Sequence, residues 1–238
     1  MAEAGAGRDP ARQAELAARL AGVRERVGAA CAAVGRQPGE LTLVAVSKTR
    51  PASDVALLRD LGLGDFGENK DQEARAKAAE VPDVRWHVVG RLQSGKARSV
   101  VAYADVVHSL DRPRLAHALS DAAERAGRTL EALVQVSLDG DPERGGAVPA
   151  DVPALADLVA ELSGLRLGGV MAVAPLGADP RTAFARLAEI AQELLRQHPD
   201  ARTVSAGMSG DLEDAVAEGA TCLRVGSALF GPRPPLLR

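Results

Sequence analysis

The sequence predicts a single α/β domain, residues 1–238, in which eight parallel strands close into a (β/α)8 barrel. The chain of 238 residues is near the usual length of a one-domain barrel of this class. Short β-rich runs alternate with helical runs from end to end, which favours parallel βαβ units over hairpins. The alternative is a doubly wound open sheet, but that fold rarely needs eight strands. It also more often has a Gly-rich loop after its first strand, where this chain has SKTRPAS.

The composition indicates a globular protein with a core of aliphatic side chains. Hydrophobic residues make up 46% of the chain and aromatic residues only 2%. The core must therefore consist of Val, Leu, Ala and Ile, which suit buried parallel strands. The net charge of -3 argues against nucleic acid binding, which needs clustered Lys and Arg. We expect a small ligand instead.

Neither a targeting segment nor a membrane span is predicted. Residues 1–16 contain no apolar run of the kind found in signal peptides. Nowhere does the chain approach the roughly 18 apolar residues that indicate a membrane helix. Cys31 and Cys222 are expected to be reduced and buried, because disulfides are unusual in cytosolic proteins. We expect a soluble, cytoplasmic protein.

The elements follow from periodicity and from the residues that end each run. The first ten residues are expected to be mobile, and residues 11–35 to form an amphipathic helix with Leu16, Leu20, Val23 and Val27 on one face. The predicted strands are residues 41–46, 64–68, 85–90, 105–110, 131–138, 166–174, 202–208 and 221–226. Helical runs between them include residues 52–62, 112–127, 151–164, 180–198 and 211–220. The second strand, GDFGE, has the weakest pattern because it is short and Gly-rich.

Lys48 directly follows the first predicted strand. In a barrel it therefore lies at the carboxyl ends of the strands, where active sites of this fold are found. Only four of the 29 Lys and Arg residues are lysines. An amine at this position indicates chemistry that Arg cannot perform, such as attack on a carbonyl to form a Schiff base. The alternative is a structural lysine whose stem packs at the strand end.

Two turns near the C-terminus have the composition of a phosphate cradle. They follow the seventh and eighth strands, between which barrels commonly bind phosphate, and contain Gly207, Ser209, Gly210 and Asp211 in SAGMSGD, and Gly226 and Ser227 in RVGSALFG. Gly lets the backbone approach an anion, Ser donates a hydrogen bond, and a helix start offers unpaired N–H groups. The same residue types are preferred helix caps, so capping is the alternative.

Arg224 lies in the eighth strand and alternates with Cys222 and Gly226, so its guanidinium can point into the barrel mouth. A surface salt bridge is the alternative. An amine, a phosphate site and an Arg between them fit a cofactor with an aldehyde, a phosphate and a polar ring, namely pyridoxal 5'-phosphate (PLP). An Arg at the pyridine nitrogen disfavours protonation of that nitrogen. This arrangement argues against transamination or decarboxylation.

Several motifs together resemble the pyridoxal phosphate homeostasis protein family: AVSKTRP, FGEN followed by QE, WHVVGRLQSGK, GVMAV and SAGMSGDLEDAVAEGATCLRVGSALFG. The resemblance extends from about Leu41 to Gly231. It implies a single barrel similar to the N-terminal domain of alanine racemase, with PLP on the lysine that matches Lys48. It also implies a role in PLP homeostasis without an established catalytic reaction.

The resemblance also implies site residues. Arg224 would face the pyridine nitrogen, while Asn69 and His87 would line the mouth of the site. The remaining positions of the implied cofactor site, mainly for phosphate, are Ser205, Gly207, Met208, Ser209, Gly226 and Ser227.

Three positions depart from the family's pattern: Lys70 where Tyr is frequent, Gly95 where LQxNK is common, and Arg144 where Lys is frequent. These departures leave the cofactor site intact. They put in doubt any function of the outer loops, including transfer of cofactor to a partner or a second binding site at Lys96.

Other polar residues have more than one interpretation. His87 beside Trp86 on a strand also fits a core histidine. The remaining histidines show no spacing with Cys, Asp or Glu that resembles a metal site, so we predict none. Glu68 could polarise Asn69, contact Lys48 or cap the following helix.

Three functions stay open from the sequence. The first is a non-enzymatic carrier that binds PLP reversibly on Lys48, with apo forms of PLP-dependent enzymes as acceptors. The second is a racemase-like enzyme. It is disfavoured because the only tyrosine, Tyr103, precedes the fourth strand and no second β domain supplies another. The third is a Schiff-base aldolase acting on a sugar phosphate. We expect the carrier, and a monomer.

Overall fold

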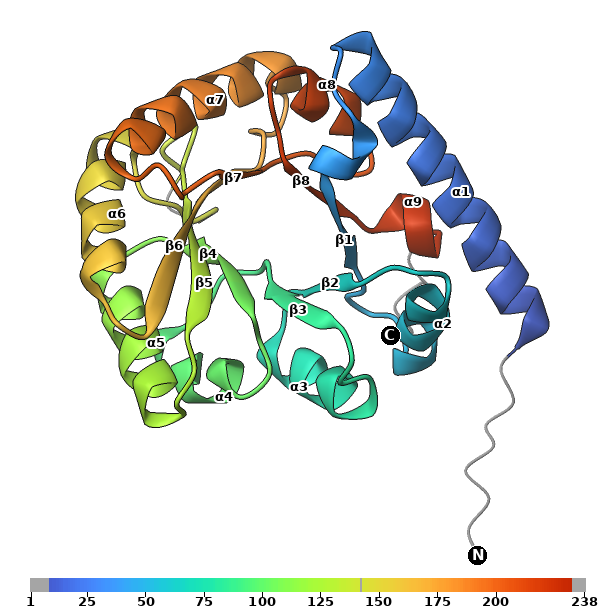
Figure 1. The fold of residues 1–238 in the computed structure, drawn as a ribbon, viewed down its shortest axis with the longest axis horizontal. Coiled ribbons are helices and arrows are strands. Elements are labelled where there is room, and N and C mark those ends of the chain that lie inside the picture. Colours follow the sequence, from blue (N-terminus) through green and yellow to red (C-terminus); the bar gives the residue numbers. More distant parts are fainter. Residues whose placement is uncertain (1–8, 142, 233–238) are drawn as a thin grey trace, which may run out of the picture.

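The computed structural model describes residues 9–141 and 143–232 and shows a closed barrel of eight parallel strands (Figure 1). The strands are β1 (Thr42–Val46), β2 (Asp65–Glu68), β3 (Arg85–Val88), β4 (Val106–Leu110), β5 (Leu130–Gln135), β6 (Leu165–Met171), β7 (Thr203–Ser205) and β8 (Cys222–Val225). Each strand pairs with the next in sequence, and β8 pairs with β1 to close the barrel. The predicted fold class is confirmed, including the short second strand.

Helices surround the barrel on its outside, as Figure 1 shows. They are α1 (Pro10–Ala33), α2 (Ala52–Asp60), α3 (Asp71–Glu80), α4 (Ala97–Val101), α5 (Pro113–Arg125), α6 (Val152–Glu161), α7 (Pro180–Gln197), α8 (Leu212–Ala217) and α9 (Ser227–Phe230). Three 3-10 turns complete the described elements: η1 (Pro38–Glu40), η2 (Ser94–Lys96) and η3 (Pro149–Asp151). Within the described ranges, no helix is long and apolar enough to cross a membrane.

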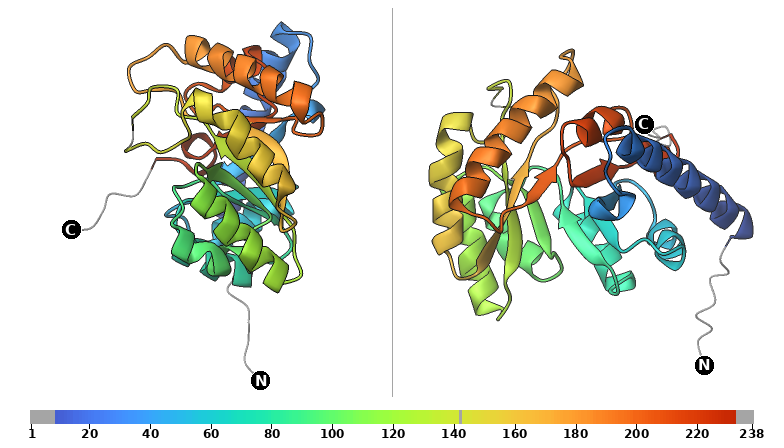
Figure 2. Two further views of the ribbon diagram at one scale, coloured as in Figure 1. Left: turned by 90° about the vertical axis from the view of Figure 1, so that its left-hand side faces the viewer. Right: turned by 45° about the horizontal axis from the view of Figure 1, so that its top comes forward.

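Helix α1 runs along the outside of the barrel beside α8 and α9 (Figure 2). It begins at Pro10 because the Asp9 carboxylate accepts hydrogen bonds from the first two free backbone N–H groups. The predicted apolar stripe is buried throughout: Leu16, Leu20, Val23 and Val27. Of the ten residues predicted to be mobile, residues 1–8 lie outside the described part of the chain. Asp9 and Pro10 differ from the prediction, because Asp9 caps α1 and Pro10 is its first residue.

Several strands end earlier than the sequence pattern predicts. Strand β7 stops at Ser205 and not at residue 208, and β6 stops at Met171 and not at residue 174. After β7 the chain must turn sharply, because Gly207 has a φ of 84°. The residues beyond the true strand ends form the loops that carry the site.

Helix α3 was not among the predicted helical runs. Only Ala74 and Lys77 of this helix are buried, so its sequence lacks the apolar stripe by which the other helices are recognised. The shorter helices α4 and α9 also escaped prediction, since four or five residues are too few to show a period.

The core has two parts. The larger lies between the strands and the surrounding helices and consists mostly of Val, Leu and Ala, as the composition predicts. Inside the barrel, a small apolar cluster of Val106, Leu133 and Met171 lies beside buried polar side chains. Cys31 and Cys222 are both buried and free, as expected.

Candidate cofactor site

A pocket of about 380 Å³ opens at the carboxyl ends of the strands. Its lining includes seven of the ten predicted site residues: Lys48, Asn69, Met208, Ser209, Arg224, Gly226 and Ser227. The pocket lining also includes residues that the sequence did not predict as site residues. The polar one among them is Arg50, in the turn after Lys48. Among the described lining residues three are cationic and none is acidic, so the pocket suits an anionic ligand.

The loop after β7 is shaped by Gly207. A Cβ at this position would lie 2.6 Å from Cβ of Ala215, and the φ of 84° disfavours any other residue. The carbonyl oxygen of Gly207 accepts a hydrogen bond from the backbone N–H of Arg224 at 2.9 Å. Gly207 therefore lies behind the pocket wall, where it fixes the path of the loop against β8.

The two predicted phosphate turns are joined by a hydrogen bond. The Ser209 hydroxyl oxygen accepts from the backbone N–H of Ala228 in α9 at 3.1 Å. The side chain of Asp211 accepts from the backbone N–H of Met208 at 2.5 Å and makes no capping bond to α8. Ser209 thus links the loops after β7 and β8 and does not cap its own helix, so capping of α8 does not explain this residue.

Arg224 is buried at the base of the pocket with an exposed fraction of 5%. Its Nη1 donates to the Ser205 hydroxyl at 2.6 Å, and its Nη2 donates to the carbonyl oxygen of Ala172 at 2.9 Å. Burial lowers the pKa of Arg224 from its ordinary value, although a guanidinium stays charged at neutral pH. The surface salt bridge considered as an alternative is therefore excluded.

A chain of hydrogen bonds extends from Arg224 across the inside of the barrel. The distances are 2.9 Å from Ser205 Oγ to His108 Nδ1, 2.8 Å from His108 Nε2 to His87 Nδ1, and 2.9 Å from His87 Nε2 to Asp65 Oδ1. Because these residues belong to β8, β7, β4, β3 and β2, their side chains can meet only in the interior.

One set of bond directions satisfies every contact in this chain with a single proton on each histidine ring. Arg224 can only donate and the Asp65 carboxylate can only accept. In this set, Ser205 accepts from Arg224 and donates to Nδ1 of His108. The Nε2–H of His108 then donates to His87, whose own Nε2–H donates to Asp65. Burial and the neighbouring His87 and Arg224 lower the pKa of His108 well below its ordinary value, in agreement with a neutral ring.

Two predicted site residues, His87 and Ser205, lie in this network and not in the pocket lining. His87 is not among the residues that line the pocket, and both its ring nitrogens are engaged in the barrel interior. Its interpretation as a core histidine is the one the geometry supports. Ser205 is fully buried beneath Arg224, so it contacts that side chain and is not part of the phosphate loops. Sequence alone could not reveal these contacts, because they join strands on opposite sides of the barrel.

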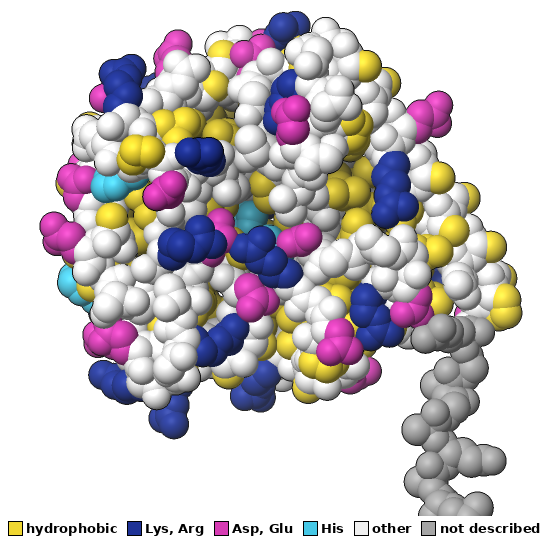
Figure 3. Space-filling view, viewed as in Figure 1, with side chains coloured by type: hydrophobic (Ala, Val, Ile, Leu, Met, Phe, Trp, Pro, Cys, Tyr) yellow, Lys and Arg dark blue, Asp and Glu magenta, His cyan; other side chains and the backbone are white. Residues whose placement is uncertain are grey.

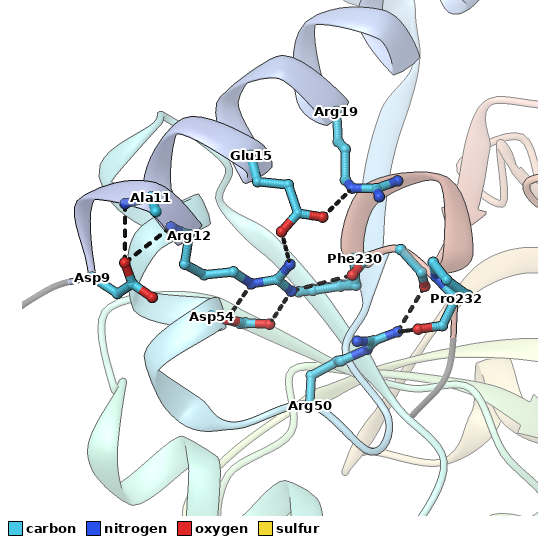
Figure 4. Close-up of polar contacts among 10 residues, drawn as sticks. Asp9, Ala11, Arg12, Glu15, Arg19, Arg50, Asp54, Phe230 and Pro232 are labelled. Atoms are coloured by element: carbon cyan, nitrogen blue, oxygen red, sulfur yellow. Dashed lines mark hydrogen bonds and ion pairs between the residues drawn. The ribbon is translucent and has the colours of Figure 1, made fainter. Parts of the chain in front are cut away.

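Helix α1 contacts the C-terminal loops from outside the barrel. Figure 4 shows Arg12 between Asp54 of α2 and the carbonyl oxygen of Phe230 in α9, with distances of 3.0 Å from Nε to Oδ1 and 3.2 Å from Nη2 to the carbonyl. Further along α1, Arg26 donates to the carbonyl oxygen of Ser209 at 3.0 Å. One helix thus stabilises both phosphate turns.

The departures from the family's pattern lie outside the pocket lining. Lys70 is exposed at the start of α3, and a Cβ on Gly95 would meet nothing within 4 Å. Arg144 donates to the carbonyl oxygens of Val173 and Ala174 at 3.2 and 2.8 Å, so it stabilises the loop after β6.

Charges on the face seen in Figure 3 are of both signs, and Lys or Arg side chains lie close to Asp or Glu. Among the described ion pairs, Arg85 and Arg166 both contact Glu131 near the start of β5. Among the described residues, no group of three or more His, Cys, Asp or Glu side chains could bind a metal ion.

The structure places a lysine beside the two predicted phosphate turns at the carboxyl end of a (β/α)8 barrel. The barrel is of the alanine racemase N-terminal class, because the family model of that domain matches residues 20–234. Among curated relatives, the pyridoxal phosphate homeostasis protein of Mycobacterium tuberculosis is 44% identical over 94% of this chain and 95% of its own. That of Escherichia coli is 38% identical over 92% of this chain and 97% of its own. The chain belongs to the family of pyridoxal phosphate homeostasis proteins.

Solved structures agree with this assignment. PipY of Synechococcus elongatus, solved with PLP bound, is 39% identical and superposes with a TM-score of 0.80 over 91% of this chain and 100% of its own. An alanine racemase of Clostridium difficile superposes with a TM-score of 0.74 over 93% of this chain and 58% of its own, at 13% identity. This second likeness concerns the fold alone.

Proposed function

We propose that this chain binds PLP as a reversible Schiff base on Lys48 and acts as a carrier and buffer in the homeostasis of this cofactor. The observation that carries the proposal is the convergence of Lys48, Arg224 and the Ser209 and Ser227 turns on one pocket, whose described lining residues include no acidic one. Relatives named as homeostasis proteins match nearly the whole chain, and one solved relative has PLP bound.

The described residues fit the parts of PLP. Lys48 supplies the amine, and the turns containing Ser209, Gly226 and Ser227 supply donors for a phosphate. Arg224 is a cation that donates to a hydroxyl and to a carbonyl oxygen, so its charge can face the lone pair of a pyridine nitrogen. Asn69 and Met208 line the remaining wall. When bound, the cofactor supplies an aldehyde that captures amines reversibly.

Two features of this chain favour a carrier over a racemase-like enzyme. A permanent cation at the pyridine nitrogen disfavours its protonation and so weakens the ring as an electron sink. Tyr103, the only tyrosine, lies between α4 and β4 and lines a different pocket with Trp86 and Arg128. Burial also raises the pKa of Tyr103, which makes it a poorer proton donor.

The proposal is tested by absorption spectroscopy and isotope exchange. The wild-type chain mixed with PLP should develop an imine band that Lys48→Ala lacks, and the band should decay when an excess of a free amine is added. Amino acids incubated with the loaded chain in heavy water should not exchange their Cα protons at useful turnover. Catalytic exchange would favour the racemase-like enzyme. The absence of an imine band with PLP, together with borohydride trapping of a sugar phosphate, would favour the aldolase.

A further inference from the structure

The backbone on both sides of Lys48 is bound by two side chains of α3, the buried Lys77 and the partly exposed Glu73. Lys77 is 5% exposed, and its Nζ donates to three oxygens: the carbonyl of Ser47 at 2.7 Å, Oε1 of Glu68 at 2.6 Å and Oε1 of Glu73 at 2.7 Å. An ammonium has three protons, so these bonds satisfy Lys77 completely. Such a buried amine is not available as a nucleophile.

The second contact comes through Glu73. Its Oε1, which accepts from Lys77, also accepts from the backbone N–H of Thr49 at 2.5 Å. The carbonyl of Ser47 belongs to the peptide bond before Lys48, and the N–H of Thr49 belongs to the peptide bond after it. Both peptide units that flank Lys48 are therefore bound to the same Lys77–Glu73 pair.

This contact coincides with unusual backbone geometry. Thr49 has a φ of 65°, and in the described ranges it is the one residue other than glycine with a positive φ. A β-branched residue is disfavoured in this conformation and adopts it only where surrounding contacts require it. The backbone N–H of Arg50 also donates to the carbonyl of Ser47 at 2.9 Å and closes this turn. Lys77 and Glu73 provide the described side-chain bonds to the same turn, and these can hold it in the disfavoured conformation.

We propose that Lys77, together with Glu73, is a positioning residue that fixes the turn after β1 and so directs the amine of Lys48 into the pocket. This inference deepens the proposed function and rests on it. Without the ammonium, two carboxylates and a carbonyl would face one another in a buried space, and the turn would relax toward negative φ. The pocket would keep its phosphate turns but lose the orientation of Lys48.

The test compares PLP affinity and imine absorbance in three variants. Lys77→Met keeps most of the side-chain volume and should raise the Kd for PLP by about tenfold, equivalent to about 1.4 kcal/mol. Thr49→Gly in the Lys77→Met background makes the positive φ acceptable without the bonds and should recover most of the affinity. Arg75→Met removes an exposed cation from the same helix and should leave the affinity unchanged.

Unchanged affinity in Lys77→Met would overturn the inference, as would a loss that Thr49→Gly does not relieve, because general destabilisation would then explain it. If Lys77→Met does not fold, Glu73→Ala takes its place with the same rescue, since Glu73 is partly exposed.

Amide hydrogen exchange of the ligand-free protein separates this inference from the proposed function. Exchange at residues 47–50 should accelerate in Lys77→Met and not in Arg75→Met. If wild type forms no imine with PLP, the proposed function fails. Accelerated exchange would then still support the positioning of the turn, and unchanged exchange would refute it.

Discussion

Hydrogen bonds beneath the pocket make the position of one side chain depend on the next, from Arg224 to Ser205 and from Ser205 to His108. His108 is neutral because it is fully buried beside the positive charge of Arg224, and a proton on it would break the bond from Ser205. Lys48 and the two phosphate turns could be located from local motifs. The hydrogen-bond chain could not, because it joins side chains from β2 to β8 that only closure of the barrel brings together.

The depressed pKa of His108 predicts a pH dependence of stability. Unfolded His titrates near 6.5, so below about that pH the unfolded chain binds a proton that the folded chain does not. Stability should therefore fall as the pH is lowered from 7 to 5, by up to about 1.4 kcal/mol per pH unit from this residue. Denaturant unfolding at several pH values should show a smaller decline in His108→Gln, whereas the exposed His117→Gln should retain the wild-type slope. Identical slopes in all three proteins would contradict the neutral assignment.

Gly207 gives a prediction about stability. Gly207→Ala places a Cβ 2.6 Å from Ala215 in a backbone conformation with a φ of 84°, so it should lower the free energy of unfolding by about 1–3 kcal/mol. Gly210→Ala is the matched control, since a Cβ there meets nothing within 4 Å. Equal stabilities of the two variants in urea would show that the loop relaxes freely.

At the scale of elements, helix α1 links the outside of the barrel to the phosphate turns. Arg26 contacts Glu213 of α8 at 2.7 Å and the carbonyl oxygen of Ser209 at 3.0 Å. Arg26→Met should weaken PLP binding several-fold while changing stability by less than about 1 kcal/mol, because the ion pair is largely exposed. Arg24→Met on the same helix, with one 3.5 Å contact to the Leu61 carbonyl, should have the wild-type Kd in an equilibrium titration. A Kd in Arg26→Met equal to that of Arg24→Met would mean that α1 does not act on the site.

All eight strands and the helices with an apolar period could be predicted because their periods and end residues are visible within one run. Helix α3 could not, because the only side chains that it buries are those of an alanine and a lysine. That same lysine, Lys77, is the residue whose role the sequence hides most completely. Its partners come from β2, from the β1–α2 turn and from α3 itself. Strand ends were predicted too long wherever apolar residues continue into the loops, as in β5, β6 and β7.

In the whole molecule, closure of the barrel brings together residues from the two ends of the fold. Lys48, which follows β1, and Ser227, which follows β8, line the same pocket. The sequence predicts that this barrel acts alone, without a partner subunit over the site. Sedimentation at micromolar concentration should therefore show a monomer, with and without PLP. A stable dimer would contradict this prediction and would require the pocket to be re-examined for residues from a second chain.

The proposed function requires that Lys48, and no other lysine, forms the bond to PLP. The most direct measurement is borohydride reduction of the chain incubated with PLP, followed by peptide mapping of the labelled lysine. We expect label on Lys48 alone, since Lys77 is buried with all three ammonium protons bonded. Label on Lys70, Lys77 or Lys96 instead, or equal labelling of Lys48→Ala, would contradict the account.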